Sequence, residues 1–378
     1  MNTIPFNKPY ITGLEIKYIQ EALMQGKLSG DGPFTRKCEK FFEETYGFRK
    51  TFLTTSCTDA LELASLVADI MPGDEVIMPS YTFVSTANPF VLRGAKIVFA
   101  DSLPAHPNMD TGLIESLITK KTKAIVPVHY AGVACDMDRV LELAAKYKLL
   151  VIEDAAQGID SFYKDKPLGS LGDFGAFSFH DTKNIVAGEG GLITVNNPDH
   201  IKRTEIIREK GTNRSSFFRG EVDKYTWVDK GSSFLPSDLT AAFLLGQLEH
   251  LKKIQSKRIA LWEQYHKELK SLESRNCIRL PLIEKYATNN GHIYYILCRD
   301  LNERTALAAH LKQNRIQASF HYQSLHDCPF FVKQHDDRVL KNASMYSNCL
   351  LRLPLFYELE PEQVSFITAT INDFFKGR

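Results

Sequence analysis

The sequence predicts an α/β protein with a mostly parallel central sheet, helices on both faces of the sheet, and a smaller C-terminal α+β part. Strand-like and helix-like patterns alternate between residues 51 and 195, which favours parallel strands joined by helical crossovers. Polar side chains follow several strand patterns, as they do where parallel strands end at a ligand site. The 378 residues, 44% of them hydrophobic, suffice for a large domain over residues 1–245 and a small one over residues 246–378.

The first elements are two helical patterns over residues 12–25 and 35–46, separated by a glycine-rich loop that ends at Pro33. A short strand pattern from Thr51 then leads through a hydroxyl-rich turn into a helix with an apolar position at Leu61. Further strand patterns cover residues 75–83, 96–101 and 123–130, and a helix is expected over about residues 136–147.

Two central strand patterns carry the residues with the most informative chemistry. The apolar run from Leu149 to Ile152 ends on Glu153 and Asp154, and the run 174–179 is followed by His180 and Lys183. An aspartate and a lysine at the carboxyl ends of two parallel strands can face one pocket. The aspartate would keep a cofactor ring nitrogen protonated and the lysine would form an imine, which is the pyridoxal phosphate arrangement. Taken singly, an aspartate after a strand is usually a helix cap or turn former, and a lone lysine is usually a solvated surface residue.

Two further positions have both a structural and a functional interpretation. Ser56 and Asp59 match a capping box, and the free amides of such a helix start can bind a phosphate. An ordinary capped helix explains the same pattern. Phe83 could stack on a planar ring, although composition alone favours packing in the core. Walker and GxGxxG motifs do not occur, so the sequence does not favour a nucleotide-binding fold.

The second half of the chain begins with a glycine turn before a strand over residues 192–195 and a helix over residues 198–209. Residues 210–233 are irregular, basic and aromatic, which is typical of a functional loop or an interface. Pro236 then opens a long helical region that is expected to continue to about Glu273. Strands are expected over residues 276–280 and 292–298, and helices over residues 303–313 and 361–375.

Composition excludes several classes of function. The net charge is +1, from 46 basic and 45 acidic residues, so neither nucleic acid nor a membrane surface is an expected partner. There is no apolar run of spanning length and no visible signal peptide. The seven cysteines are odd in number and contain no CxxC, so we expect no disulfide framework and no metal site. Reduced thiols in a cytoplasmic protein account for them.

Taken together, five segments carry a resemblance to a known family. They are Pro79-Ser-Tyr-Thr-Phe83, Glu153-Asp154-Ala-Ala-Gln157, Ser178-Phe-His-Asp-Thr-Lys183, Gly188-Glu-Gly-Gly191 and His321-Tyr-Gln-Ser-Leu-His326. With them, essentially the whole chain resembles the sugar aminotransferases of the DegT/DnrJ/EryC1/StrS family, which have the aspartate aminotransferase fold. The loops at residues 208–214, 222–227 and 231–233 resemble one subgroup, which makes dTDP-4-amino-4,6-dideoxygalactose in enterobacterial common antigen synthesis.

The resemblance implies pyridoxal 5'-phosphate as cofactor and assigns a role to each matching residue. Lys183 would carry the cofactor as an imine and act as general base and acid, and Asp154 would pair with the pyridinium nitrogen. Gln157 would bind the 3-oxygen of the ring, and Phe83 would stack on the ring. The phosphate would be bound by Ser56, Cys57, Thr58 and Ser178. His321, Tyr322 and His326 would lie near the amino donor or the sugar.

The expected substrates are L-glutamate and a nucleotide-linked keto sugar, in a homodimer whose active sites are shared between subunits. Arginines suit the sugar's diphosphate, and Arg214 and Arg219 lie in the loop expected at the interface. Two positions depart from the family. Cys57 stands where many members have glycine, and Ser233 stands where many have an asparagine that reaches the partner's cofactor phosphate.

Two alternatives belong to different reactions or classes. Sugar dehydratases of the same family resemble this chain but have histidine at the position of Lys183, which argues against dehydration here. A binding or regulatory protein could keep the fold and the loops without turnover, and it would not need Lys183.

Overall fold

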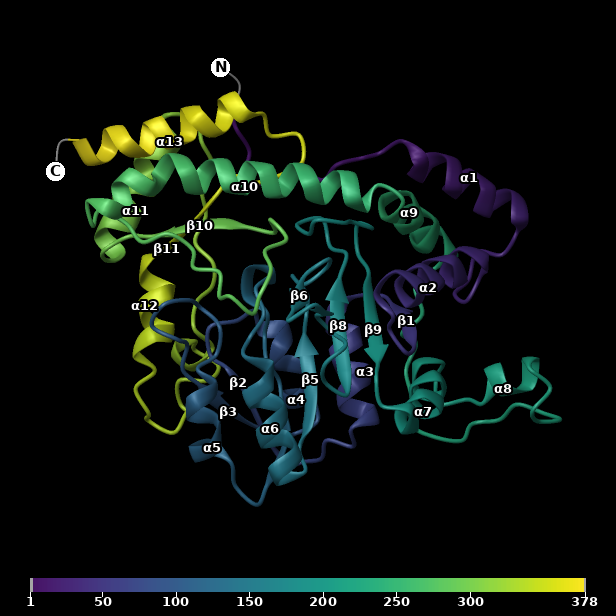
Figure 1. Ribbon diagram of the computed structural model, residues 1–378. Coiled ribbons are helices and arrows are strands. Elements are labelled where there is room, and N and C mark those ends of the chain that lie inside the picture. The colour runs from purple at the N-terminus through teal and green to yellow at the C-terminus, as the bar shows by residue number, and fades with distance from the viewer. Residues whose placement is uncertain (1–2, 377–378) are drawn as a thin grey trace.

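The computed structural model describes residues 3–376, and its largest element is a seven-stranded sheet in the order β1-β9-β8-β5-β4-β2-β3. The strands are β1 (Thr51–Thr54), β2 (Glu75–Pro79), β3 (Lys96–Ala100), β4 (Thr122–Ile125), β5 (Leu150–Asp154), β8 (Phe174–Ser178) and β9 (Gly191–Val195). Neighbours from β3 to β8 are parallel, and β9 is antiparallel to both β8 and β1 (Figure 1). The prediction of a mostly parallel α/β sheet is confirmed.

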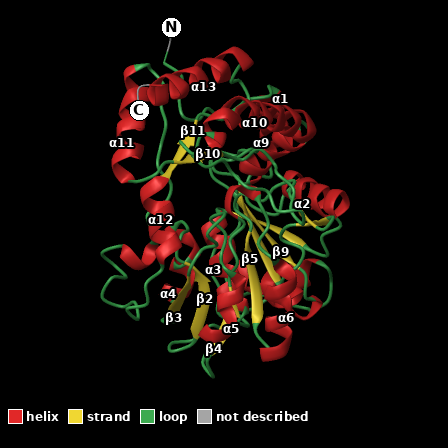
Figure 2. Cartoon of the chain, turned by 60° about the vertical axis from the view of Figure 1, so that its left-hand side comes forward, coloured by secondary structure: helices red, strands yellow, loops and turns green. Residues whose placement is uncertain are grey.

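Helices cover both faces of this sheet (Figure 2). One face packs against α3 (Cys57–Val67), α4 (Asn88–Leu92) and α7 (Pro198–Arg208). The other face packs against α2 (Pro33–Tyr46), α5 (Ile114–Leu117) and α6 (Met137–Tyr147), with α1 (Leu14–Gln25) and α9 (Asp238–Leu248) packed beyond α2. Two separate apolar clusters fill the space on either side of the strands. Because helices cover both faces of the sheet, the sequences of the strands are continuous apolar runs and do not alternate between apolar and polar residues.

The C-terminal region forms a second layer of structure above the carboxyl ends of β5 and β8 (Figure 1). Its elements are α10 (Leu251–Ser274), β10 (Tyr294–Leu297), α11 (Leu301–Gln313), α12 (Lys341–Cys349), β11 (Leu350–Leu353) and α13 (Pro361–Lys376). β10 and β11 pair antiparallel, and a third apolar cluster lies between this pair and the helices. Ile4 belongs to this third cluster, and its N–H donates to the Arg315 carbonyl at 2.9 Å. A division at residue 245 stays a prediction, and the apolar clusters of the large sheet continue past it, to Ile254 on one face and Leu350 on the other.

Three details of the C-terminal half differ from the sequence prediction. The long helical region is two helices, because His250 has the non-helical angles φ −104° and ψ 6° between α9 and α10. Residues 276–280 form no strand, and only Arg279 bridges to Leu297. The sequence prediction missed α12 and β11.

Short elements complete the chain. They are β6 (Phe162–Tyr163) paired with β7 (Lys166–Pro167), the 3-10 turns η1 (Val84–Thr86), η2 (Thr111–Leu113), η3 (Tyr130–Gly132) and η4 (Leu325–Asp327), and the helix α8 (Arg214–Phe218). The segment expected to be irregular therefore contains one short helix. We call residues 210–233 the α8 arm, and it projects from the body of the chain (Figure 1).

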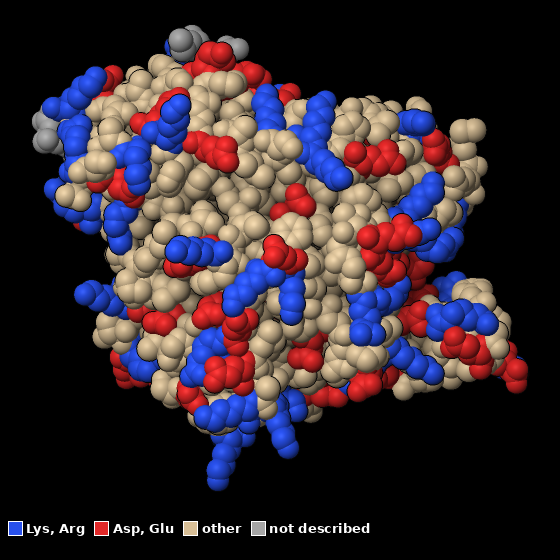
Figure 3. Space-filling view, viewed as in Figure 1, with Lys and Arg blue, Asp and Glu red and all other residues tan. Residues whose placement is uncertain are grey.

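Surface charge is mixed on the face seen in Figure 3, where basic and acidic side chains are interspersed. This agrees with the near-zero net charge and gives no large field of one sign on that face. Among residues 3–376, no helix combines the length and the apolar character that crossing a bilayer requires. All seven cysteines are free thiols.

Candidate active site

A cavity of about 510 Å³ lies at the carboxyl ends of β5 and β8, between the sheet and the C-terminal region. It brings together most of the residues selected from the sequence. Those lining it are Ser56, Cys57, Thr58, Phe83, Asp154, Gln157, Ser178, Lys183, His321 and Tyr322. Ser233, His326, Arg214 and Arg219 do not line it.

Asp154 faces this cavity because of the two-residue period of β5. Val151 and Ile152 belong to apolar clusters on opposite faces of the sheet, so Asp154 shares the face of Ile152 and α3. Its Oδ2 accepts a hydrogen bond from Thr86 Oγ1 at 2.6 Å, and its Oδ1 accepts one from the Ala156 N–H at 3.1 Å. These bonds hold a buried carboxylate in a fixed orientation.

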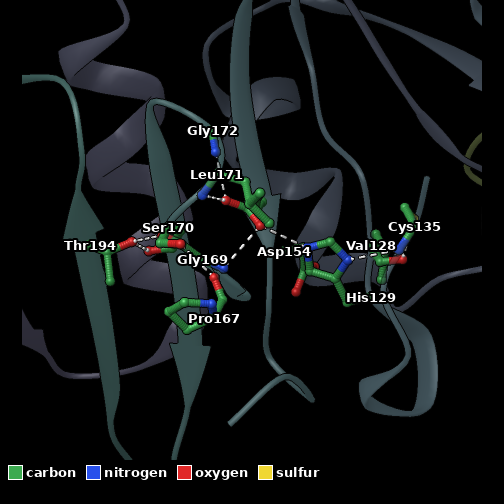
Figure 4. Close-up of polar contacts among 12 residues, drawn as sticks. Val128, His129, Cys135, Asp154, Pro167, Gly169, Ser170, Leu171, Gly172 and Thr194 are labelled. Carbon is green, nitrogen blue, oxygen red and sulfur yellow. Dashed lines mark hydrogen bonds and ion pairs between the residues drawn. The ribbon is translucent and has the colours of Figure 1, made fainter. Parts of the chain in front are cut away.

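Glu153 lies on the opposite face and is fully buried. Its carboxylate accepts hydrogen bonds from the N–H groups of Gly169, Leu171 and Gly172, at 2.9, 2.7 and 2.7 Å (Figure 4). His129 Nδ1 accepts from the Cys135 N–H, so the proton on this ring is on Nε2 and is donated to Glu153 at 2.9 Å. Glu153 therefore holds a loop and a histidine in place, and only Asp154 of this pair is available to a ligand.

Lys183 follows β8, the strand next to β5, and its side chain lines the cavity. No hydrogen bond or ion pair of its amine is formed within residues 3–376. Desolvation lowers the pKa of Lys183, and it outweighs the attraction of the nearby Asp154 carboxylate. A lysine with a lowered pKa beside a fixed carboxylate in a cleft is typical of an amine nucleophile.

The start of α3 supplies free amides to the same cavity. Ser56 caps this helix by accepting the Asp59 N–H at 3.0 Å, which confirms the first half of the predicted capping box. The strand β9 touches this turn closely, since a Cβ on Gly191 would lie 2.3 Å from the Ser56 carbonyl. Cys57 is buried here, and desolvation raises the pKa of its thiol.

Phe83 and Gln157 lie on the walls of the cavity. Phe83 is 53% exposed, so the interpretation that it packs in the core is wrong. Its ring lies 5.8 Å from the ring of Tyr322. Gln157 accepts the Ala131 N–H at 2.6 Å and donates to the Tyr322 hydroxyl at 3.0 Å. The 320–326 segment thus touches the large sheet's loops directly.

Two tyrosines hold this segment in place by its backbone. The hydroxyls of Tyr81 and Tyr130 both donate to the His321 carbonyl, the latter at 3.1 Å. His326 is buried below the segment, with its Nδ1 2.6 Å from Ser80 Oγ. In this chain His321 and Tyr322 reach the cavity, whereas His326 lies behind the wall.

The α8 arm keeps its arginines away from this cavity. Arg219 donates to Glu205 at 2.7 and 2.8 Å and to Glu221 at 2.6 Å. The Arg214 guanidinium lies 5.3 Å from the centre of the Phe218 ring. Neither arginine lines the cavity of its own chain.

Among the cavity residues that the sequence analysis did not select, two basic ones come from the C-terminal region. Arg352 lies on β11, where a single arginine within the apolar run 350–355 was the available signal. His292 precedes β10, and its Nδ1 lies 2.8 Å from Asn184 Oδ1. Asn184 Nδ2 donates to the Asn290 carbonyl at 2.9 Å, so His292 Nδ1 must carry the proton. Its Nε2 is therefore an acceptor in a cavity that also contains Lys183.

Comparison with known proteins settles the family. The DegT/DnrJ/EryC1/StrS aminotransferase family matches residues 9–372. The chain belongs to this family. The spore coat polysaccharide biosynthesis protein SpsC of Bacillus subtilis is 32% identical over 387 residues, covering 99% of this chain and 97% of SpsC. GDP-perosamine synthase of Escherichia coli O157:H7 is 31% identical over 382 residues, covering 100% of both chains.

Solved structures give the same result for the fold. Spr1654 of Streptococcus pneumoniae, a proposed sugar aminotransferase, has been solved in a PLP form and a PMP form. Each form superposes with a TM-score of 0.90 at 27% identity and covers 98% of both chains. The aspartate aminotransferase fold, the cofactor pyridoxal phosphate and the aminotransferase class predicted from the motifs are therefore confirmed.

The cavity fits this cofactor. Pyridoxal phosphate needs an amine, an anion for its ring nitrogen and donors for its phosphate. Lys183, Asp154 and the amides at the start of α3 supply these groups around one space. The lowered pKa of Lys183, caused by desolvation, increases the fraction of its neutral amine.

Proposed function

We propose that this aminotransferase moves the amino group of L-glutamate to C4 of dTDP-4-dehydro-6-deoxy-D-glucose and forms dTDP-4-amino-4,6-dideoxy-D-galactose. The enzyme class follows from the family. The choice of sugar rests on the subgroup resemblance of residues 208–214, 222–227 and 231–233. The observation that carries the transamination itself is Lys183, an amine of lowered pKa due to desolvation, beside Asp154 in one cavity.

Bound pyridoxal phosphate supplies an aldehyde that exchanges amines and a ring that withdraws electrons from the reacting carbon. Lys183 would hold the cofactor through its amine and would move the proton at the substrate carbon. Asp154, fixed by Thr86 and Ala156, keeps the ring nitrogen protonated. Tenfold or greater slowing is expected when such a preorganised charge is removed.

The remaining cofactor contacts follow from the walls of the cavity. Phe83 would cover one face of the ring, and the Gln157 amide, which also donates to the Tyr322 hydroxyl, would donate to the ring oxygen. The phosphate would bind at the start of α3, where the helix dipole favours an anion. Its donors are Ser56, Cys57, Thr58 and Ser178, with Cys57 contributing its backbone N–H.

The proposal includes a homodimer in the cytoplasm with active sites shared between subunits. Arg214, Arg219 and Ser233 belong to the α8 arm and do not line the cavity of their own chain, so in the proposed dimer they would act on the partner's site. The two arginines would bind the diphosphate of the nucleotide sugar, and Ser233 the cofactor phosphate. His321 and Tyr322 would contact the amino donor or sugar directly, with His326 behind them.

A second candidate acceptor is a GDP-linked keto sugar. It is favoured by the 31% identity to GDP-perosamine synthase, which spans the full length of both chains. Both candidates use the same residues around Lys183 and differ in the nucleotide and the sugar.

The test is an acceptor panel. The purified holoenzyme is given L-glutamate with dTDP-, UDP- and GDP-linked keto sugars, and kcat/KM is measured for each, with products resolved by mass and NMR. We expect dTDP-4-dehydro-6-deoxy-D-glucose to be preferred by at least about 100-fold, as a site built for one base discriminates. Preference for a GDP sugar would replace the proposed acceptor. Absence of amination with every sugar, with pyridoxal phosphate bound, would refute the proposed function.

A further inference from the structure

His292 presents one unused hydrogen-bond acceptor to the cavity. The residue precedes β10, and only 3% of it is exposed. Its Nδ1 donates to Asn184 Oδ1 at 2.8 Å, which leaves the lone pair of the neutral ring on Nε2. Nε2 forms no hydrogen bond within residues 3–376 and, unlike Arg352 Nε, it is not enclosed by protein atoms. This acceptor therefore faces the open space of the cavity.

The other polar groups of His292 are each held by a buried partner. Its N–H donates to Asn290 Oδ1 at 3.0 Å, and its carbonyl accepts from Arg258 Nη2 at 2.7 Å. Asn184, which orients the ring, donates to Gln255 Oε1 at 2.8 Å and to the Asn290 carbonyl at 2.9 Å. The protein thus fixes the position of Nε2 in advance, as it does for groups that contact a ligand.

The ring stays neutral in this position. Desolvation lowers the pKa of His292 well below its ordinary value, and the positive charges of Lys183, Arg352 and Arg258 lower it further. Because protonation would remove the acceptor, the neutral ring is the form that can bind a donor at physiological pH. An acceptor left without a donor costs free energy once a substrate displaces water from the cavity. The substrate should therefore bring a donor to Nε2.

An inventory of donors in the proposed reaction leaves one chemical class for this acceptor. The cofactor phosphate, the ring oxygen and the carboxylates of glutamate are acceptors, and the ring nitrogen would pair with Asp154. The amino group is the reacting group and must stay free to bond to carbon. Lys183 lines the same cavity, but its amine forms no hydrogen bond with His292 Nε2. The hydroxyls of the sugar remain, and the 3-hydroxyl is attached to the carbon next to C4.

We propose that His292 Nε2 accepts a hydrogen bond from the 3-hydroxyl of the nucleotide-linked keto sugar and so selects acceptors that carry this hydroxyl. This inference rests on the proposed function and names a specificity determinant of its sugar step. The charge of Lys183 reaches the His292 ring, although desolvation is the larger cause of the lowered pKa of the histidine. The ring is therefore near the amine beside which C4 reacts, where the 3-hydroxyl also lies.

The first experiment compares sugars in the unmodified holoenzyme. The amine-loaded enzyme is given dTDP-4-dehydro-6-deoxy-D-glucose, its 3-deoxy analogue or its 2-deoxy analogue, and kcat/KM is measured for each. We expect kcat/KM to be at least about 30-fold lower for the 3-deoxy analogue, because it leaves the acceptor unpaired. The 2-deoxy analogue, which controls for the loss of any hydroxyl, should react at least about tenfold better than the 3-deoxy analogue. If the acceptor panel selects another nucleotide, the same comparison is made with its keto sugar.

Two substitutions separate the cavity acceptor from the bond to Asn184. His292→Gln can place an amide oxygen where Nε2 lies, whereas His292→Asn can keep a donor to Asn184 but has no atom at the Nε2 position. In His292→Asn the preference for the 3-hydroxyl should fall below about threefold, through slower reaction of the 3-hydroxy sugar alone. His292→Gln should keep most of the preference. His310→Asn, on α11 and outside the cavity lining, should change neither value.

A binding measurement removes the dependence on turnover. The pyridoxal form of the enzyme has no amine to give, so it binds the keto sugar without converting it. In the unmodified protein the calorimetric Kd of the sugar should be at least about tenfold lower than that of the 3-deoxy analogue, and in His292→Asn the two should agree within about threefold. The half-reaction with L-glutamate should change less than about threefold in every variant, because glutamate brings no hydroxyl.

Three outcomes would overturn the assignment. Equal efficiency of the 3-hydroxy and 3-deoxy sugars in the unmodified protein would exclude the contact, whatever the variants do. Equal losses with both sugars in His292→Asn would assign the preference to another residue. Loss of both half-reactions in His292→Gln, with full activity in His292→Asn, would make the ring a structural support of Asn184. None of these outcomes would affect the proposed transamination, which fails only if no sugar of the acceptor panel is aminated.

Discussion

Lys183 is held where its charge is unfavourable. Desolvation lowers the pKa of its amine, although Asp154 attracts the charged form. Before the cofactor binds, the folded protein therefore bears the cost of a poorly solvated ammonium. The same environment makes the amine a better nucleophile near neutral pH. Stability and function oppose one another at this residue, as they often do at active sites.

This opposition predicts that Lys183→Met stabilises the cofactor-free protein at pH 7, by about 1 kcal/mol. A lowered pKa in the folded state means that the penalty is complete below that pKa and fades as pH rises toward the ordinary value of 10.5. The advantage of the variant should therefore shrink between pH 7 and pH 10.5. Urea unfolding of the cofactor-free proteins at both pH values measures it.

Lys120→Met is the matched control, since Lys120 is exposed, and it should change stability little at either pH. A Lys183→Met protein that is less stable than the unmodified one at pH 7 would contradict this account of the site.

Strand-end chemistry made Lys183 and Asp154 visible from the sequence, because both follow apolar runs of neighbouring parallel strands. Arg352 was not visible, because it reaches the cavity only where β11 packs over a sheet whose strands lie roughly 160 to 300 positions earlier in the chain, which is a purely tertiary contact. The prediction that Phe83 packs in the core was wrong for a related reason. A phenylalanine is expected to be buried, but the cavity leaves this side chain 53% exposed.

At the scale of secondary-structure elements, the proposed phosphate site at the start of α3 depends on how closely β9 packs against the turn before that helix. β9 is the one antiparallel strand among its sheet neighbours, and its first residue, Gly191, lies against the Ser56 carbonyl. Any side chain there would push the start of α3 away from its place at the cavity. The glycine-rich turn before β9 was recognised in the sequence, but the particular glycine that the packing requires was not.

Gly191→Ala should weaken pyridoxal phosphate binding by at least about tenfold, because its Cβ would meet backbone atoms 2.3 Å away and displace the amides of α3. Gly190→Ala is the matched control, since the nearest atom to its Cβ is an ordinary contact at 3.4 Å. Fluorescence titration of both proteins with the cofactor gives the two dissociation constants. Equal affinities would show that the close contact between Gly191 and Ser56 does not determine the position of the amides that bind the phosphate.

The α8 arm is the other element with a clear consequence. Phe218 is 70% exposed and Trp227 is 78% exposed, and Tyr225 lies between them in sequence. An apolar surface of this kind is typical of a protein interface. The aromatic composition of this segment already predicted an interface from the sequence, although the sequence analysis did not predict the short helix within it.

We expect a dimer in sedimentation velocity at micromolar concentration, and replacement of both Phe218 and Trp227 by serine should weaken it at least about tenfold, since large aromatics dominate interface energies. Phe330→Ser removes an aromatic outside the arm that is 60% exposed, and it should leave the dimer intact. A fully active monomer would rule out shared active sites.

At the scale of the whole molecule, the active site lies between two layers that the sequence predicts with unequal success. The alternating pattern predicted the large sheet and its helices, because buried parallel strands and amphipathic crossovers leave clear periodic signals. The C-terminal region was predicted less well, since its strands are short and one predicted strand is a single bridge at Arg279. The cavity residues contributed by that region were therefore the least predictable from the sequence.

The central claim is that the amino group of L-glutamate is transferred, in the cavity that contains Lys183, to C4 of a dTDP-linked sugar. The most direct measurement is the NMR spectrum of the product formed by the holoenzyme from ¹⁵N-labelled L-glutamate and dTDP-4-dehydro-6-deoxy-D-glucose. The account predicts ¹⁵N bonded to C4, with the small couplings between H3, H4 and H5 that an axial amine produces. A label at another carbon, an equatorial amine, or no label in the sugar at all would contradict it.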